Sequence, residues 1–332
     1  MSAEGGTKAV VAALLANTGI AITKFVAFFL TGVSSMLAEA IHSVADAGNQ
    51  LLLLIGGRTA KREATPNHPF GFGRDRYIYS FIVAIVLFTV GGLFALYEAY
   101  HKYHEIHEAH GHPEDSILTS RWWWVPLVVL GIAIVLESFS FRTAIIETNK
   151  TRGDASYWKF IRRAKSPELP VILLEDFAAL LGLVFAFVAV TLSLVTENLY
   201  WDVVGTALIG VLLVAVAVIL AIETKSLLLG EAAAPEAQAR IRDAIESVDG
   251  IDSLIHMKTL HLGPEELLVA AKIAVTASDS AAEVAGAIDA AEARIREVEP
   301  TASSIYLEAD LRRDPASEPA PDPASDPASD KG

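Results

Sequence analysis

Apolar runs long enough to cross a lipid bilayer fill most of the chain up to residue 222. A membrane-spanning helix needs roughly 20 consecutive apolar residues, because it rises about 1.5 Å per residue through a hydrocarbon core about 30 Å thick. The runs of this length are Ala9–Leu30, Ser34–Ile55, Ile78–Tyr100, Trp122–Phe141, Leu169–Val195 and Val203–Ile222. They predict a polytopic α-helical membrane protein, with six transmembrane helices over residues 1–229.

The composition supports this class and narrows the chemistry. Of the 332 residues, 52% are hydrophobic, which is too many for an ordinary soluble domain of this length. The formal net charge of −14 argues against a nucleic-acid partner. The chain has no cysteine, so a metal would have to bind His, Asp, Glu or backbone oxygen. No cleavable signal peptide is expected, because Met1–Thr7 is polar and the next run has the length of a membrane helix.

The charges between the runs predict the orientation. The loops after the second and fourth runs are rich in Lys and Arg, whereas Thr196–Asp202 contains neither. Positively charged loops stay on the cytoplasmic side of a membrane. Both termini are therefore expected in the cytoplasm, with the protein in the inner or plasma membrane of the cell.

After Leu229 the pattern becomes that of a small α+β domain over residues 230–312. Its expected elements are, in order, Pro235–Val248 (helix), Leu254–Leu260 and Glu266–Val275 (strands), Ser280–Val298 (helix) and Ser304–Glu308 (strand). A domain of this size has a thin core and would be stabilised by pairing with a second copy. The acidic, Pro-rich tail, residues 313–332, is predicted to be disordered.

Ionisable side chains interrupt two of the apolar runs. His42 and Asp46 are four residues apart, so they project from the same face of a helix. Glu175 and Asp176 interrupt the fifth run. Ionisable groups at membrane depth are costly, and they usually mark the path of a substrate. His with Asp or Glu is also a ligand set for divalent transition metals, so these four residues predict a metal-transport site.

Several longer motifs carry a family resemblance. They are Glu39-Ala40-Ile41-His42-Ser43-Val44-Ala45-Asp46, His68-Pro69-Phe70-Gly71-Phe72-Gly73-Arg74 and Leu174-Glu175-Asp176. Together with the order of six runs and an α+β domain, they resemble the cation diffusion facilitator family of proton-coupled divalent-metal exporters. The resemblance implies a homodimer with a cytoplasmic ferredoxin-like domain. It also implies a transport site between the second and fifth helices, made of His42, Asp46 and Asp176.

The fifth-helix motif departs from the commonest family pattern. Ile172 stands where that pattern has a histidine, four residues before Asp176. Glu175 is adjacent to Asp176 and so points about 100° away from it on an ideal helix. A branch of the family carries this Glu-Asp pair. Glu175 is therefore a candidate metal ligand, with pairing to Lys24 or proton relay as the alternatives.

Other candidate metal sites are weaker. Thr65, His68 and Phe72 occupy the positions of a loop site found in some family members, and no metal is predicted there. In the α+β domain the candidates are His256, His261, Glu308 and Asp310, with Ala271 in place of a ligand. A histidine row after the third run either gathers metal or is a solvated stripe: His101, His104, His107, His110 and His112.

The predicted function is export of Zn²⁺ from the cytoplasm in exchange for protons, by alternating access. The metal is substrate rather than cofactor, and the expected partners are metal ions, protons, the lipid bilayer and a second copy of the chain. Mn²⁺, Fe²⁺ or Co²⁺ as the ion, and a metal permease without proton coupling, remain as alternatives. An intramembrane metalloenzyme is not expected, because the sequence has no H-E-x-x-H helix. A metal sensor is disfavoured because the α+β domain lacks any catalytic motif.

Overall fold

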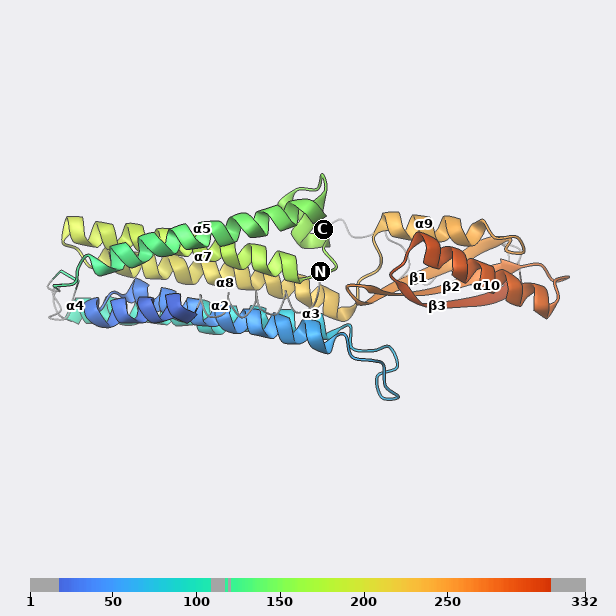
Figure 1. Ribbon diagram of the computed structural model, residues 1–332, viewed down its shortest axis with the longest axis horizontal. Helices are drawn as coiled ribbons and strands as arrows, with labels where there is room; N and C mark the ends of the chain where they lie inside the picture. Colours follow the sequence, from blue (N-terminus) through green and yellow to red (C-terminus); the bar gives the residue numbers. More distant parts are fainter. Residues whose placement is uncertain (1–17, 109–116, 119–120, 312–332) are drawn as a thin grey trace. The chain divides into compact units, whose positions relative to one another are not determined.

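The computed structural model describes residues 18–108, 117–118 and 121–311 (Figure 1). The chain divides into two compact units, Met1–Leu229 and Gly230–Gly332. The tail expected to be disordered lies outside the described residues, as do His110 and His112.

The first unit is a bundle of long helices that run lengthwise beside one another (Figure 1). Thr18–Thr31 forms an apolar helix, and the labelled helices are α2 (Ser34–Thr59), α3 (Asp75–Val86), α4 (Phe94–Glu108), α5 (Val125–Arg152), α6 (Tyr157–Arg163), α7 (Glu168–Thr196) and α8 (Tyr200–Leu229). A π-helical turn, η1 (Leu87–Leu93), joins α3 to α4. The core between the helices is apolar and includes Met36, Leu87, Leu183 and Leu213.

Within the described residues, four helical segments have the length and hydropathy to cross a membrane: Asp75–Glu108, Val125–Arg152, Glu168–Thr196 and Tyr200–Leu229. Helix α2 has sufficient length, at 26 residues, but it carries several polar side chains and is less apolar. Thr18–Thr31 is shorter, because the start of the run Ala9–Leu30 lies outside the described residues. A helical membrane domain is thus established, while the six-span topology stays a prediction.

The helix ends correct two sequence-based boundaries. Helix α5 continues to Arg152, so Arg142 and Lys150 lie on a helix and not in the loop expected after Phe141. The stretch beyond Phe141 contains no Pro or Gly before Gly153, whose φ of 56° ends the helix. The third run is likewise longer than Ile78–Tyr100, and its periodicity gave no sign of the π-helical turn.

The described part of the second unit, up to residue 311, contains a three-stranded sheet and two helices. Its elements are α9 (Pro235–Glu246), β1 (Ser253–Gly263), β2 (Glu266–Val275), α10 (Ala281–Val298) and β3 (Ala302–Leu311). Strands β1 and β2 are antiparallel, and β2 and β3 are parallel, with order β1-β2-β3. Parallel neighbours need a crossover connection, which α10 supplies. The α+β class is as expected, but the described αββαβ order lacks the leading strand of a full ferredoxin-like βαββαβ fold.

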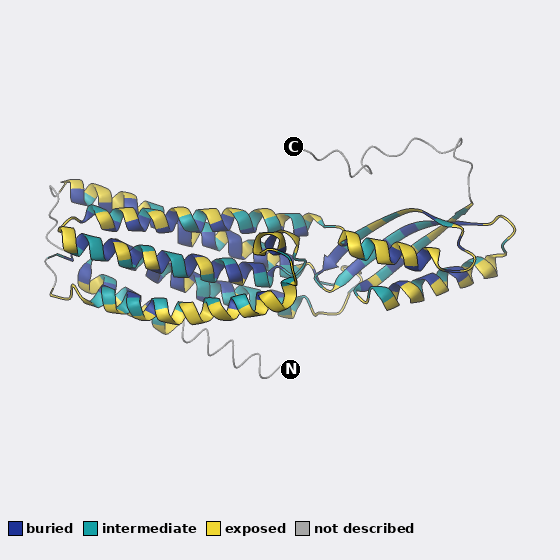
Figure 2. Cartoon of the chain, turned by 90° about the horizontal axis from the view of Figure 1, so that it is seen from above, coloured by how far each residue is buried: buried dark blue, intermediate teal, exposed yellow. Residues whose placement is uncertain are grey.

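Burial differs strongly among the long helices, and each of them has both buried and exposed residues along its length (Figure 2). Only 17% of the most apolar stretch of α5 is buried, against 50% for α8. The exposed side chains of α5 include Val128, Ile132 and Phe139. Exposed apolar surface of this extent suits lipid as the surrounding solvent.

Candidate metal site

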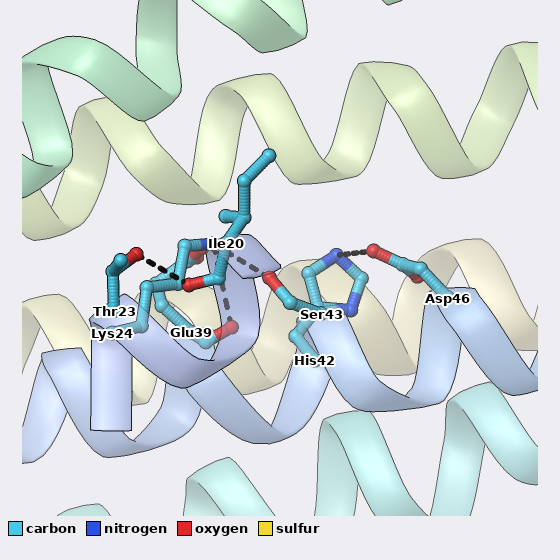
Figure 3. A network of polar contacts seen from close by, with 7 residues as sticks. All are labelled: Ile20, Thr23, Lys24, Glu39, His42, Ser43 and Asp46. Carbon is cyan, nitrogen blue, oxygen red and sulfur yellow. Dashed lines mark hydrogen bonds and ion pairs between the residues drawn. The ribbon is translucent and has the colours of Figure 1, made fainter. Parts of the chain in front are cut away.

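Helix α2 carries a row of polar side chains whose acceptor atoms lack hydrogen bonds. His42 is 1% exposed, and its Nε2 lies 3.5 Å from Oδ2 of Asp46 one turn later (Figure 3). Both ring nitrogens of His42, Oδ1 of Asp46, Oδ1 of Asn49 and Oε1 of Gln50 are buried and form no hydrogen bond. Buried polar atoms are nearly always hydrogen-bonded, so a row of exceptions indicates a place where another species binds.

Helix α7 contacts α2 and presents the two acidic residues of the fifth run. Glu175 is buried and accepts a hydrogen bond of 2.7 Å from Nδ2 of Asn49, which joins α7 to α2. Asp176 instead accepts a hydrogen bond of 2.9 Å from Oγ of Ser140 on α5. The adjacent acids therefore point to different neighbouring helices, as their 100° separation predicts.

These side chains share one electrostatic environment, although they do not converge on one point. Asp46 interacts electrostatically with Asp176 and with Glu175, and Glu137 of α5 interacts with both aspartates. Among the residues that the structure describes, no three His, Asp or Glu side chains are close enough to hold one metal ion together. His42 is thus paired with Asp46, whereas Glu175 is hydrogen-bonded to Asn49 and Asp176 to Ser140.

Lys24 has a different partner from the one considered in the sequence. Its ammonium lies 3.0 Å from Oε2 of Glu39 and donates a hydrogen bond of 2.8 Å to Oγ of Ser43 (Figure 3). The alternative in which Lys24 pairs with Glu175 is therefore wrong: Glu39 lies on the neighbouring helix next to Lys24, and Glu175 is held by Asn49.

The π-helical turn η1 forms the wall beside His42. A β-carbon on Gly91 would lie 4.0 Å from Nδ1 of His42, so backbone without a side chain faces the imidazole. Such turns are frequent at functional sites, since the extra residue shifts the hydrogen-bond pattern of the helix. The turn also packs against α8, where a β-carbon on Gly92 would lie 2.7 Å from Cγ2 of Val214.

Asp202 is a buried acid that sequence reasoning placed in a loop. It lies in the first turn of α8 and accepts hydrogen bonds from the backbone N–H groups of Ser34 (2.8 Å) and Ser35 (3.2 Å) and from the Ser35 hydroxyl (2.5 Å). The first N–H groups of a helix have no partner within that helix, and a carboxylate is well suited to them. Asp202 therefore caps α2 and fixes its end to α8.

The other candidate sites are occupied by protein contacts in the described part of the chain. Each of His101, His104 and His107 packs its ring against a tyrosine of α4, which is Tyr97, Tyr100 or Tyr103 respectively. In the α+β unit, Lys272 lies 2.8 Å from Asp310 and 3.3 Å from Glu308. Its hydrogen bonds to Asp310 and then Glu308 raise the pKa of Lys272. The Lys272 ammonium is thus the partner of both acids that were candidate metal ligands in this unit.

A helical membrane domain with a buried histidine next to an aspartate on one of its helices is typical of membrane proteins that bind or move ions. The family model of the cation efflux transmembrane domain matches residues 10–229. The chain therefore belongs to the cation efflux, or cation diffusion facilitator, family.

Two curated relatives support the family membership. The chain is 31% identical over 262 residues to the mouse protein named proton-coupled zinc antiporter SLC30A9, mitochondrial, covering 78% of this chain and 44% of that protein. It is 26% identical over 268 residues to metal tolerance protein C4 of Arabidopsis thaliana, covering 80% of this chain and 56% of that protein. The chain thus spans about half the length of these relatives.

Among solved structures, a carboxy-terminal domain of MamM in a nickel form is similar to part of this chain. It is 21% identical, covers 24% of this chain and all of that domain, and has a TM-score of 0.23.

Proposed function

We propose that the protein moves a divalent transition metal across a membrane in exchange for protons, with Zn²⁺ as the favoured ion. One imidazole with carboxylates suits a tetrahedral zinc site. A mouse relative is named a proton-coupled zinc antiporter. Mn²⁺, Fe²⁺ and Co²⁺ are the alternative ions, because a site rich in carboxylate oxygen suits them as well.

The proposed ligands are His42, Asp46 and Asp176, with Glu175 as a fourth. The observation that carries this proposal is the set of buried atoms on His42 and Asp46 of helix α2 that form no hydrogen bond. A metal ion would supply the missing partner for these atoms. To join them, Asp176 exchanges its hydrogen bond from Ser140 for the ion, and Glu175 does the same with its bond from Asn49.

Proton coupling follows from the chemistry of these ligands. Imidazole and carboxylate groups must lose their protons before they bind a metal, so metal and protons compete for the same atoms. When the site is open to the cytoplasm, metal displaces protons. When it opens to the other side, protons displace the metal, and the exchange needs no separate machinery.

The pairing and the location are further parts of the proposal. A homodimer is supported by the thin core of the α+β unit, which would be stabilised by a second copy. A cell membrane with cytoplasmic termini is supported by the distribution of Lys and Arg. The mouse relative is named mitochondrial, so an organellar membrane is the alternative location.

Zinc uptake by proteoliposomes that contain the full chain tests this function. An acidic lumen is expected to drive Zn²⁺ inward against its own gradient, with a simultaneous rise in luminal pH. A permease without coupling would move Zn²⁺ only down its gradient, at a rate that does not depend on the imposed pH difference. Parallel assays with Mn²⁺, Fe²⁺ and Co²⁺ rank the ions.

A further inference from the structure

We propose that Glu39 is a second carboxylate that binds the transported metal along its path. When no metal is bound there, the Lys24 ammonium, a cation attached to the protein itself, takes the place of the metal at Glu39. This inference rests on the proposed function. When no metal is present, the positive charge of the Lys24 ammonium balances the negative charge of the Glu39 carboxylate. An arriving metal ion displaces the ammonium from Glu39.

The contacts of Lys24 are those of a bound cation. Its side chain is 4% exposed, and that of Glu39 is fully buried. The ammonium reaches Oε2 of Glu39 at 3.0 Å, Oγ of Ser43 at 2.8 Å and the backbone oxygen of Glu39 at 3.4 Å. Three oxygen atoms thus surround the nitrogen, an arrangement that a metal ion could also use.

The second oxygen of Glu39 remains available. Oε1 is buried and forms no hydrogen bond. It faces α7, where a β-carbon on Gly182 would lie only 2.7 Å away. Gly182 therefore provides the space for this carboxylate at the interface between α2 and α7. An unpartnered carboxylate oxygen inside a protein is costly, which indicates that Glu39 has a further ligand in another state of the protein.

Glu39 is also aligned with the proposed metal ligands. It precedes His42 by three residues and Asp46 by seven, so all of them lie along one face of α2 within about two turns. The Lys24 ammonium also interacts electrostatically with both His42 and Asp46. A metal ion that leaves the His42–Asp46 pair would meet Glu39 next along this face.

Removing the two partners separately should change metal affinity in opposite directions. Lys24→Met removes the competing cation, so the Kd for Zn²⁺ should fall at least about tenfold, since unit charges interact strongly inside a protein. Release should then be slower, and the maximal transport rate should fall together with KM. Glu39→Gln leaves the ammonium without its carboxylate, so the Kd and KM for Zn²⁺ should rise at least about tenfold for the same reason.

A purely structural ion pair gives a different pattern. Loss of either partner of a buried pair leaves an uncompensated charge and destabilises the protein. Both single variants would then lose stability and activity, with no opposite shifts in Kd. The double variant Lys24→Met/Glu39→Gln has no such unpaired charge, so it serves if either single variant fails to fold. Its Kd should lie between those of the two single variants. If Lys24→Met does not fold, the Kd of the double variant should still be lower than that of Glu39→Gln.

The measurement is Zn²⁺ binding by titration calorimetry to the purified full chain in lipid nanodiscs, together with transport KM and maximal rate. Lys102→Met is the matched control, because Lys102 is another buried lysine paired with a glutamate, at 3.1 Å from Glu105 on α4. Its Kd should stay within about twofold of the unaltered protein, because the ion pair of Lys102 is with Glu105 on its own helix and not with the row on α2.

The outcomes separate this inference from the proposed function. Opposite shifts of Kd in Lys24→Met and Glu39→Gln support the inference that Lys24 takes the place of the metal at Glu39, whereas equal-signed shifts or none overturn it. In the double variant, a Kd equal to or above that of Glu39→Gln overturns it as well. If Asp46→Asn binds Zn²⁺ as tightly as the unaltered protein, the proposed metal site itself is wrong.

Discussion

Replacing Asp46 with asparagine is expected to lower Zn²⁺ transport at least about 100-fold, because even the hydrogen-bond partners of metal ligands contribute 10- to 100-fold. The substitution keeps the shape of the side chain but removes its charge. Oδ1 of Asp46 forms no hydrogen bond, and Oδ2 lies 3.5 Å from Nε2 of His42. The fold should therefore tolerate the change. Initial uptake rates in proteoliposomes measure the effect, and thermal unfolding of the purified protein checks the fold.

The matched control for Asp46→Asn is Glu147→Gln. Glu147 is an exposed carboxylate on α5, paired with Lys150 at 2.6 Å on the helix surface. Exposed ion pairs contribute little, so transport by this variant should equal that of the unaltered protein. Transport by Asp46→Asn within a factor of about three of the unaltered protein would contradict the role of α2 as the metal-carrying helix.

Replacing Asp202 with alanine is expected to destabilise the first unit by about 3 kcal/mol or more, because buried donors would lose a charged acceptor. The affected donors are the backbone N–H groups of Ser34 and Ser35 and the hydroxyl of Ser35. Loss of this cap would free the end of α2 from α8 and lower the unfolding temperature. Denaturant unfolding in bicelles, followed by the fluorescence of the tryptophans, measures the change.

Asp202→Asn is the informative comparison for that prediction. Asparagine keeps one acceptor oxygen but loses the charge, so its stability should lie between those of Asp202→Ala and the unaltered protein. Equal stability of all three proteins would show that Asp202 does not anchor α2. An effect of Asp202→Asn on Zn²⁺ affinity without loss of stability would instead assign Asp202 to the metal path.

The helices and strands were largely predictable because their signals are local. The run Leu169–Val195 predicts α7 to within one residue at either end, and Glu266–Val275 coincides with β2. Glycine and proline mark the turn after β1, and Ser280 caps α10 through a capping box with Glu283. The π-helical turn η1 has no such local signal, because the apolar residues before and after it continue the helical pattern.

The partners of the buried polar groups were much less predictable. The i, i+4 spacing brought His42 and Asp46 together in the sequence, and the structure pairs them. Asp202 and Ser34 are hydrogen-bonded although they are 168 residues apart in the sequence, and Ser140 donates to Asp176 from another helix. Such pairs depend on how helices pack, which a single sequence does not encode in any short pattern. The spacing of Asn49 from His42, two turns along one face, was the signal that could have added it to the site.

The most direct test of the account is the position of Zn²⁺ in a crystal structure of the metal-bound protein, located by anomalous scattering at the zinc edge. The account predicts one ion between α2 and α7, bound about 2.0–2.2 Å from a His42 nitrogen and from oxygens of Asp46 and Asp176. A zinc ion bound elsewhere in the membrane domain, with Asp176 still on Ser140 and His42 without a metal, would contradict it.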